Sequence, residues 1–180
     1  MANEINVTKR IVGTAVFAAL SYAVSYLEFP IFPAAPFLKL DFSAVFLMLA
    51  AFMFGPVWGI GACAVKELLC LLKSSTGGVG EIANFLVITG YIIIPSIVYC
   101  YRKGIKTVII TLIIACLVQV VLALLANRFI NFPLFMGEGA AAAFSSLWIF
   151  VALFNLIKAV SVSVITILLY KRISRFIKKI

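Results

Sequence analysis

Long apolar runs, separated by short polar stretches, constrain this chain more than any other feature of its sequence. Hydrophobic residues make up 65% of the 180 residues and charged residues only 12%. A soluble domain has roughly a quarter of its residues charged and about half apolar. A chain of this length cannot hide so much apolar surface in its own core. We therefore predict an integral membrane protein of the all-α class.

The apolar runs predict six transmembrane helices in one membrane domain that covers residues 1–180. The expected spans are approximately 11–27, 42–54, 58–72, 82–101, 107–126 and 146–170. A helix needs about 20 apolar residues to cross the hydrocarbon core. The second and third runs are shorter than that, so we expect one or both to be tilted or incomplete.

The basic residues indicate how the chain is oriented. The net charge is +9, and ten of the fifteen basic residues flank apolar runs in three clusters: Lys9-Arg10; Arg102, Lys103 and Lys106; Lys171, Arg172, Arg175, Lys178 and Lys179. With six spans all three clusters fall on one side, which the positive-inside rule makes cytoplasmic. Both termini are then cytoplasmic. Such clusters contact anionic lipid more often than nucleic acid, and no nucleic-acid partner is expected.

The sequence lacks the residues that several kinds of catalytic and metal-binding site require. The sequence contains no His, which removes His-based triads, proton relays and imidazole metal sites. Asp41 is the only aspartate, and no nucleophile–base pair, metal cluster or ATP-binding motif is evident. We therefore expect no catalytic residue, no metal and no cofactor. The four cysteines are interpreted as small buried apolar residues: Cys63, Cys70, Cys100 and Cys116.

The longest polar interruption is the glycine-rich stretch 73–85, with sequence KSSTGGVGEIANF. Three glycines in four residues permit a tight turn and a close approach to another molecule. One interpretation is a connecting loop with a helix cap. The other is one wall of a site for a neutral, hydroxyl-rich small molecule. A phosphate-binding loop is excluded because no Gly-Lys-Ser/Thr follows the glycines.

Two further stretches interrupt the apolar runs on the same side. Segment 28–41 contains three prolines within seven residues, which forbid a regular helix. It is too apolar for a free linker, so we expect it to fold back as a lid or plug, with Asp41 or Ser43 capping the next helix. Segment 127–139 is expected to be a second long irregular region.

Polar residues inside the apolar runs mark candidate binding groups. Asn155 and Lys158 lie three residues apart, on one helix face and too deep to reach water easily. One reading is a structural hydrogen bond to a neighbouring helix, for example from Lys158 to Glu67 or Glu81. The other is recognition of a ligand's polar edge, since an amide offers a donor and an acceptor side by side.

Lys66 and Glu67 are adjacent, and because neighbouring positions point about 100° apart on a helix we expect no pairing between them. Asn84 and Asn127 lie near the outer surface, where they either cap helices or reach the same cavity as Asn155. The outer stretches also carry phenylalanines that either anchor at the membrane interface or line a pocket for a flat ring: Phe29, Phe32, Phe37, Phe85, Phe129, Phe132 and Phe135.

A stripe of small residues runs along one face of the first span. Ala15, Ala19 and Ala23 recur at four-residue spacing and would let another helix pack closely. The partner helix could belong to this chain or to another protein.

Four sequence blocks together resemble a known family. They are the Ala15/Ala19/Ala23 stripe, segment 29–43, segment 75–85 and the Asn-Leu-Ile-Lys-Ala sequence at 155–159. In order and spacing they are similar to the substrate-binding S components of energy-coupling-factor (ECF) vitamin transporters, and most of all to the riboflavin S component. The resemblance covers nearly the whole chain.

The resemblance implies a six-helix membrane protein that binds riboflavin with high affinity on the outer face of a prokaryotic plasma membrane. Its partners would be a transmembrane coupling subunit and two cytoplasmic ATPases, with the alanine stripe as the docking face. Asn155, Lys158 and Asn127 would meet the uracil-like edge, the phenylalanines the ring, and the glycine-rich stretch the ribityl hydroxyls. The implied ligand-binding set is Asn155, Lys158, Asn127, Asn84, Thr76, Gly77, Gly78, Glu81, Leu40 and Phe37.

Three alternatives remain open at this point. The first is an S component for another vitamin, such as folate or thiamine; a cationic ligand would require carboxylates in the pocket, and few are available. The second is an intramembrane enzyme such as a lipid-modifying transferase, against which the missing His and the single Asp speak. The third is a scaffold without a ligand.

Overall fold

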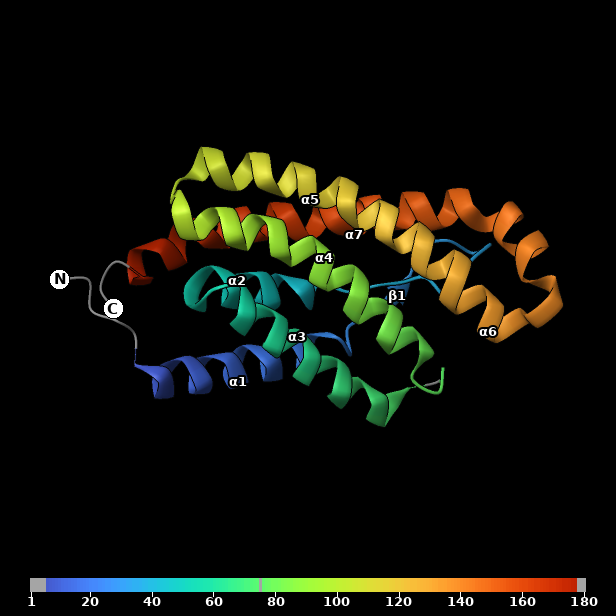
Figure 1. The fold of residues 1–180 in the computed structure, drawn as a ribbon, viewed down its shortest axis with the longest axis horizontal. Helices are drawn as coiled ribbons and strands as arrows, with labels where there is room; N and C mark the ends of the chain where they lie inside the picture. Colours follow the sequence, from blue (N-terminus) through green and yellow to red (C-terminus); the bar gives the residue numbers. More distant parts are fainter. Residues whose placement is uncertain (1–5, 75, 178–180) are drawn as a thin grey trace.

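The computed structural model describes residues 6–74 and 76–177, and it confirms the all-α class (Figure 1). The helices are α1 (Val7–Val24), α2 (Ala44–Phe54), α3 (Pro56–Cys70), α4 (Val79–Tyr101), α5 (Ile105–Ala126), α6 (Phe132–Met136) and α7 (Ala140–Ile177). A short antiparallel hairpin of β1 (Phe29–Pro30) and β2 (Lys39–Leu40) lies between α1 and α2.

Three helical stretches of the described residues are long and apolar enough to cross a bilayer. They are α1, α4 and the continuous helical run Ile105–Tyr170. In Figure 1 this run turns back at α6, so that α5 and α7 lie side by side. With 11 and 15 residues, α2 and α3 are shorter than the roughly 20 residues that a full span requires.

The two ends of the bundle differ in character (Figure 1). The start of α1, the end of α7 and the connection Arg102–Gly104 lie at one end, and these are the places where the basic clusters occur. Lys178 and Lys179 of the last cluster lie outside the described residues. The glycine-rich connection before α4 and the short helix α6 lie at the opposite end.

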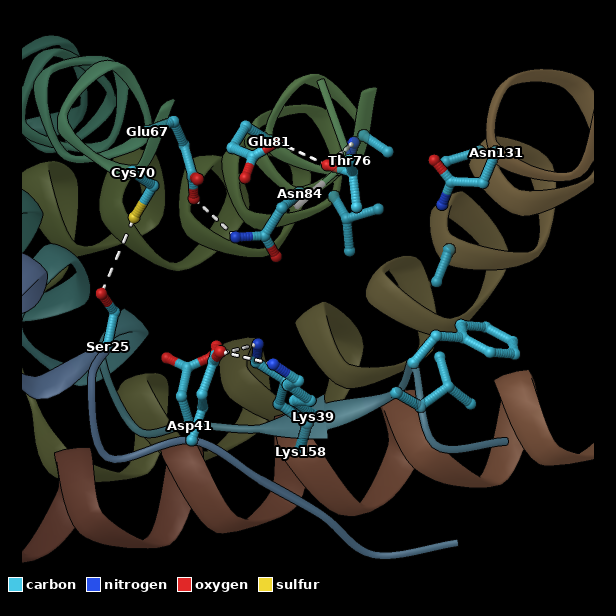
Figure 2. A pocket seen from close by; sticks show the side chains of 18 of the residues that line it. Ser25, Lys39, Asp41, Glu67, Cys70, Thr76, Glu81, Asn84, Asn131 and Lys158 are labelled. Carbon is cyan, nitrogen blue, oxygen red and sulfur yellow. Dashed lines mark hydrogen bonds and ion pairs between the residues drawn. The ribbon is translucent and has the colours of Figure 1, made fainter. Parts of the chain in front are cut away.

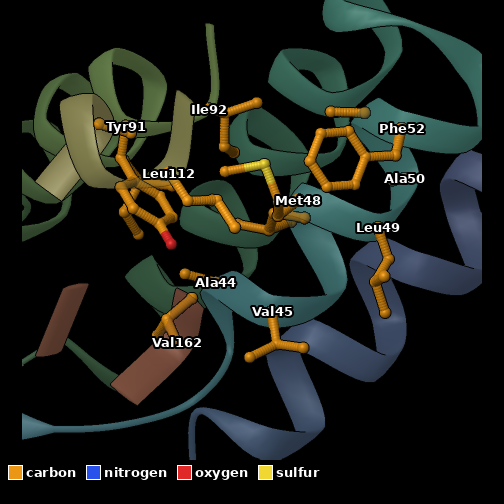
Figure 3. Close-up of a cluster of buried hydrophobic side chains, with 14 of the residues drawn as sticks. Ala44, Val45, Met48, Leu49, Ala50, Phe52, Tyr91, Ile92, Leu112 and Val162 are labelled. Carbon is orange, nitrogen blue, oxygen red and sulfur yellow. The ribbon is translucent and has the colours of Figure 1, made fainter. Parts of the chain in front are cut away.

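Helix α2 forms the centre of the packing (Figure 3). It is apolar all round, and eight of its eleven residues are buried, as expected for a helix enclosed by others. It packs against α1, α3, α4 and α7. A side chain at Gly59 would overlap the Cβ of Ala51, so the glycine permits the close approach of α3 to α2.

The segment between α1 and α2 folds back over the bundle, as its apolar composition predicted. Phe29 pairs with Leu40 and Pro30 with Lys39 in the hairpin. Ala35, Leu38 and Leu40 are buried in a cluster with Phe132, Val151 and Phe154. At its end the Asp41 carboxylate accepts a hydrogen bond from the backbone N–H of Ser43 at 2.8 Å, whereas the Ser43 side chain makes no cap bond.

Two predictions about this fold were wrong. The segment expected to be irregular is helical: a wide π-helical turn (Asn127–Asn131) continues from α5 and is followed by α6 and a 3-10 turn (Gly137–Gly139). Pro133 does not interrupt it, because a helix tolerates proline in its first turn. All four cysteines are free, but Cys100 is exposed and not buried, because it faces outward in the last turns of α4.

Candidate functional site

A cavity of about 410 Å³ opens at the end of the bundle opposite the basic clusters. Its walls come from the hairpin segment, from α3 and the turn after it, from the start of α4, and from α5 and α7 (Figure 2). The volume lies in the range typical of small-molecule sites, roughly 300–1,000 Å³. A ligand in this cavity would contact segments from most of the chain.

Lys158 and Asp41 form an ion pair on one side of the cavity (Figure 2). The Lys158 Nζ lies 2.7 Å from the Asp41 Oδ2, and both residues are 6% exposed. Burial alone would raise the pKa of the Asp41 carboxyl, but the ammonium of Lys158, and then that of Lys66, hold this pKa well below its usual range. Asp41 is therefore ionised.

The partner of Lys158 differs from the expected one. Glu67 and Glu81 were the carboxylates considered for a structural bond, and neither forms a hydrogen bond or an ion pair with Lys158. The hairpin instead carries Asp41 against α7. Spacing along helices could not show this, because the path of a loop depends on how it packs.

Lys66 and Glu67 pair with each other, contrary to the sequence-based expectation. The Lys66 Nζ lies 2.8 Å from the Glu67 Oε1, and both side chains are buried. Although neighbouring Cβ atoms diverge, both side chains are long and flexible, and attraction between opposite charges is strong away from water. Glu67 also accepts a hydrogen bond from the Asn84 Nδ2 at 2.5 Å, which gives Asn84 a place in the cavity wall rather than in a helix cap.

Three amides besides Asn84 line the cavity: Asn127, Asn131 and Asn155. Asn155 and Asn127 each donate Nδ2 to the carbonyl oxygen of the preceding helical turn, on Val151 and Ala123. Asn127 Oδ1 accepts from the Nδ2 of Asn131 at 3.1 Å. The Asn131 Oδ1 is buried, and among the described residues it has no hydrogen-bond partner. Such an acceptor is costly to leave unpaired, which points to a donor from a ligand.

The glycine-rich stretch forms the wall opposite Lys158 (Figure 2). Thr76 and Glu81 line the cavity. Gly77 and Gly78 have φ values of 62° and 94°, a left-handed conformation that favours glycine, so they shape the turn. Neither residue lines the cavity. Leu40 of the hairpin strand β2 is buried and does not line the cavity either. Ser75 lies outside the described residues.

The aromatic lining consists of Phe37, which the sequence analysis named, and Phe154, which it missed. Phe132 supports Phe37 from behind, with ring centroids 6.0 Å apart. Of the other phenylalanines considered, these do not line the cavity: Phe29, Phe32, Phe85, Phe129, Phe132 and Phe135. Asn131 was also missed. Its spacing of four from Asn127 would have placed both on one face if segment 127–139 had been recognised as helical.

The alanine stripe lies on the surface of the bundle. Ala15, Ala19 and Ala23 are exposed on α1, whereas Ala18 is fully buried and faces the interior. The stripe therefore does not serve the packing within this chain and is available to a partner helix or to lipid.

A helical membrane bundle with a polar cavity at one end defines a binding protein for a small molecule. The chain belongs to the family of ECF transporter substrate-specific components, whose family model matches residues 9–170. The family consists of transporters rather than enzymes.

Named relatives agree with this assignment. The chain is 35% identical to the riboflavin transporter RibU of Staphylococcus aureus, over 96% of this chain and 94% of the relative. It is 25% identical to the riboflavin transporter FmnP of Bacillus subtilis, covering 95% of each. A solved structure, described as the S component of a bacterial ECF transporter, matches with a TM-score of 0.83 and 35% identity, over 96% of this chain and 99% of that one.

Proposed function

We propose that this chain is the riboflavin-binding membrane subunit of an ATP-driven ECF importer, and that it captures riboflavin on the outer face of the cell membrane. Relatives that match over nearly their whole length are named riboflavin transporters. The observation that carries the proposal is the cavity itself. It places the buried ammonium of Lys158 on one side and a hydroxyl-bearing wall on the other, with amides among its lining.

These two sides suit the two halves of riboflavin. The uracil-like edge of a flavin carries carbonyl acceptors and one N–H donor. Lys158 has three N–H donors, so it can keep its bond to Asp41 and donate to a ligand carbonyl as well. The Oδ1 atoms of Asn155 and Asn131 are acceptors for the N–H. Phe37 and Phe154 would contact the ring, and Thr76 and Glu81 the ribityl hydroxyls.

The arrangement of the chain in the membrane is part of the proposal. Residues 1–180 form one membrane domain with six spans, of which those at α2 and α3 are short. Both termini lie in the cytoplasm, because the basic clusters gather at that end of the bundle. The cavity then opens to the outside of the cell, where the protein would encounter riboflavin.

Transport requires partners, because this chain carries no recognisable ATP site. A transmembrane coupling subunit and two cytoplasmic ATPases would supply the energy. The exposed stripe of Ala15, Ala19 and Ala23 is the proposed docking face.

Thiamine and folate fit the cavity less well. More carboxylates line it than were expected from the sequence, but three of the four form ion pairs with lysines. A dianionic vitamin would face these carboxylates and a cationic one these lysines, whereas riboflavin is uncharged.

The visible absorption spectrum of the purified protein tests the proposal. A flavin that copurifies would give the yellow absorption band of flavins, and added riboflavin should bind to protein stripped of ligand, with quenching of flavin fluorescence. Thiamine and folate at equal concentration should not compete. Protein that is folded yet fails to bind riboflavin would overturn the proposed function.

A further inference from the structure

Glu81 differs from the other carboxylates of the cavity. Of the described residues, four carboxylates and four lysines line it: Glu28, Asp41, Glu67 and Glu81; Lys39, Lys66, Lys73 and Lys158. Three of these carboxylates form ion pairs with three of these lysines, at 2.9, 2.8 and 2.7 Å. Within residues 6–74 and 76–177, Glu81 forms no ion pair.

Hydroxyl groups hold Glu81 in place instead. Its Oε2 accepts hydrogen bonds from the Ser74 Oγ and the Thr76 Oγ1, both at 2.9 Å. These neutral donors orient the carboxylate without cancelling its charge. A carboxylate has about four lone-pair sites, so Glu81 retains acceptor capacity for hydroxyl groups of a ligand.

We propose that Glu81 makes the site selective for the uncharged vitamin over its phosphate ester, riboflavin 5′-phosphate (FMN). This inference rests on the proposed function. The carboxylate would accept hydrogen bonds from ribityl hydroxyls. It would repel the phosphate, which carries nearly two negative charges at neutral pH, because like charges repel strongly where water is limited.

Three of the four lysines of the cavity are held in ion pairs, so among the described residues Lys73 is the one cavity lysine left to attract a phosphate against this repulsion. The charges of Lys66 and Lys158 are balanced by their ion-pair partners, Glu67 and Asp41. Lys39 is paired with Glu28 at the exposed rim. The Nζ of Lys73 donates to the Ser25 carbonyl at 2.7 Å and lies 4.4 Å from the centre of the Tyr26 ring.

Equilibrium titrations of riboflavin and FMN against the purified, ligand-free protein test the inference. Wild-type protein should bind riboflavin more tightly than FMN. Glu81→Gln keeps the size and the hydrogen-bond acceptor but removes the charge, so it should move the ratio of the two affinities toward FMN by about tenfold. Glu138→Gln is the matched control, because Glu138 is exposed and lies outside the cavity; it should leave the ratio unchanged.

A second variant guards against misfolding of the first. In Glu81→Ala the hydroxyls of Ser74 and Thr76, which lie 3.1 Å apart, can still bond to each other. It should shift the ratio in the same direction while weakening riboflavin binding. An unchanged ratio in both variants, or wild-type protein that binds FMN as tightly as riboflavin, would overturn the inference. Absence of riboflavin binding in the wild type would overturn the proposed function instead.

Discussion

Lys158 and Asp41 stand 117 residues apart in the sequence and meet at 2.7 Å inside the cavity. The contact joins α7 to the segment that follows the hairpin. A buried charge left without its partner is costly, and breaking such a pair by removing one side typically destabilises a protein by about 3–5 kcal/mol. Lys158 thus has a structural contact as well as its proposed contact with the ligand, and the two roles require separate tests.

The first prediction concerns the affinity of Lys158→Met. Methionine keeps much of the side-chain length but removes the ammonium, and charge-assisted hydrogen bonds contribute about 1.5–3 kcal/mol. Riboflavin binding should therefore weaken about tenfold to a hundredfold. Asn155→Leu should act in the same direction with a smaller effect, since it removes a neutral group. Fluorescence titration of well-folded protein measures both, and unchanged dissociation constants would remove these residues from the site.

A double variant separates the two roles of Lys158. Asp41→Asn should lower the thermal stability, because it leaves the buried ammonium without its carboxylate. Adding Lys158→Met removes that ammonium, so the double variant should recover part of the lost stability. Its affinity for riboflavin should remain as low as that of Lys158→Met alone. If the affinity for riboflavin returned together with the stability, Lys158 would affect binding only by stabilising the fold.

The low pKa of Asp41 predicts how this stabilisation depends on pH. The carboxyl has a lower pKa in the folded protein than the ordinary value of about 3.9, because Lys158 and Lys66 outweigh the effect of burial. Its contribution is complete above that ordinary value and is lost as the pH falls toward the folded one. The difference in melting temperature between wild type and the double variant Asp41→Asn/Lys158→Met, which leaves no unpaired ammonium at this position, should stay constant between about pH 5 and 8. A steep change of this difference between pH 5 and 8 would mean that a group other than Asp41 titrates there.

The sequence located the helices better than it located the contacts of the site. The spans expected at 82–101 and 107–126 correspond to Val79–Tyr101 and Ile105–Ala126, because an apolar run in a membrane protein has few alternatives to a helix. Helix α7 begins at Ala140 rather than near residue 146, since alanines continue the helix beyond the apolar run. The partners of Lys158 and Lys66 depend on tertiary packing, which no helical spacing encodes.

Cysteine labelling tests the proposed orientation. In a variant that lacks the four native cysteines, Thr76→Cys should react with a membrane-impermeant maleimide added outside intact cells. Arg102→Cys, in the exposed turn between α4 and α5, should react only after the cells are opened. Bound riboflavin should also protect Thr76→Cys, because Thr76 lines the cavity. Labelling of Thr76→Cys from the inside alone would refute the orientation.

The last prediction concerns the alanine stripe on α1. Ala19 is exposed, so Ala19→Leu adds volume without disturbing the core, but it prevents another helix from approaching closely. Copurification with the coupling subunit and uptake of riboflavin should fall, while affinity and melting temperature of the isolated protein should change little. Leu20→Ala is a matched control, because Leu20 is also exposed on α1 and its truncation leaves the stripe intact. If Ala19→Leu assembles and transports like the wild type, this face of α1 contacts only lipid.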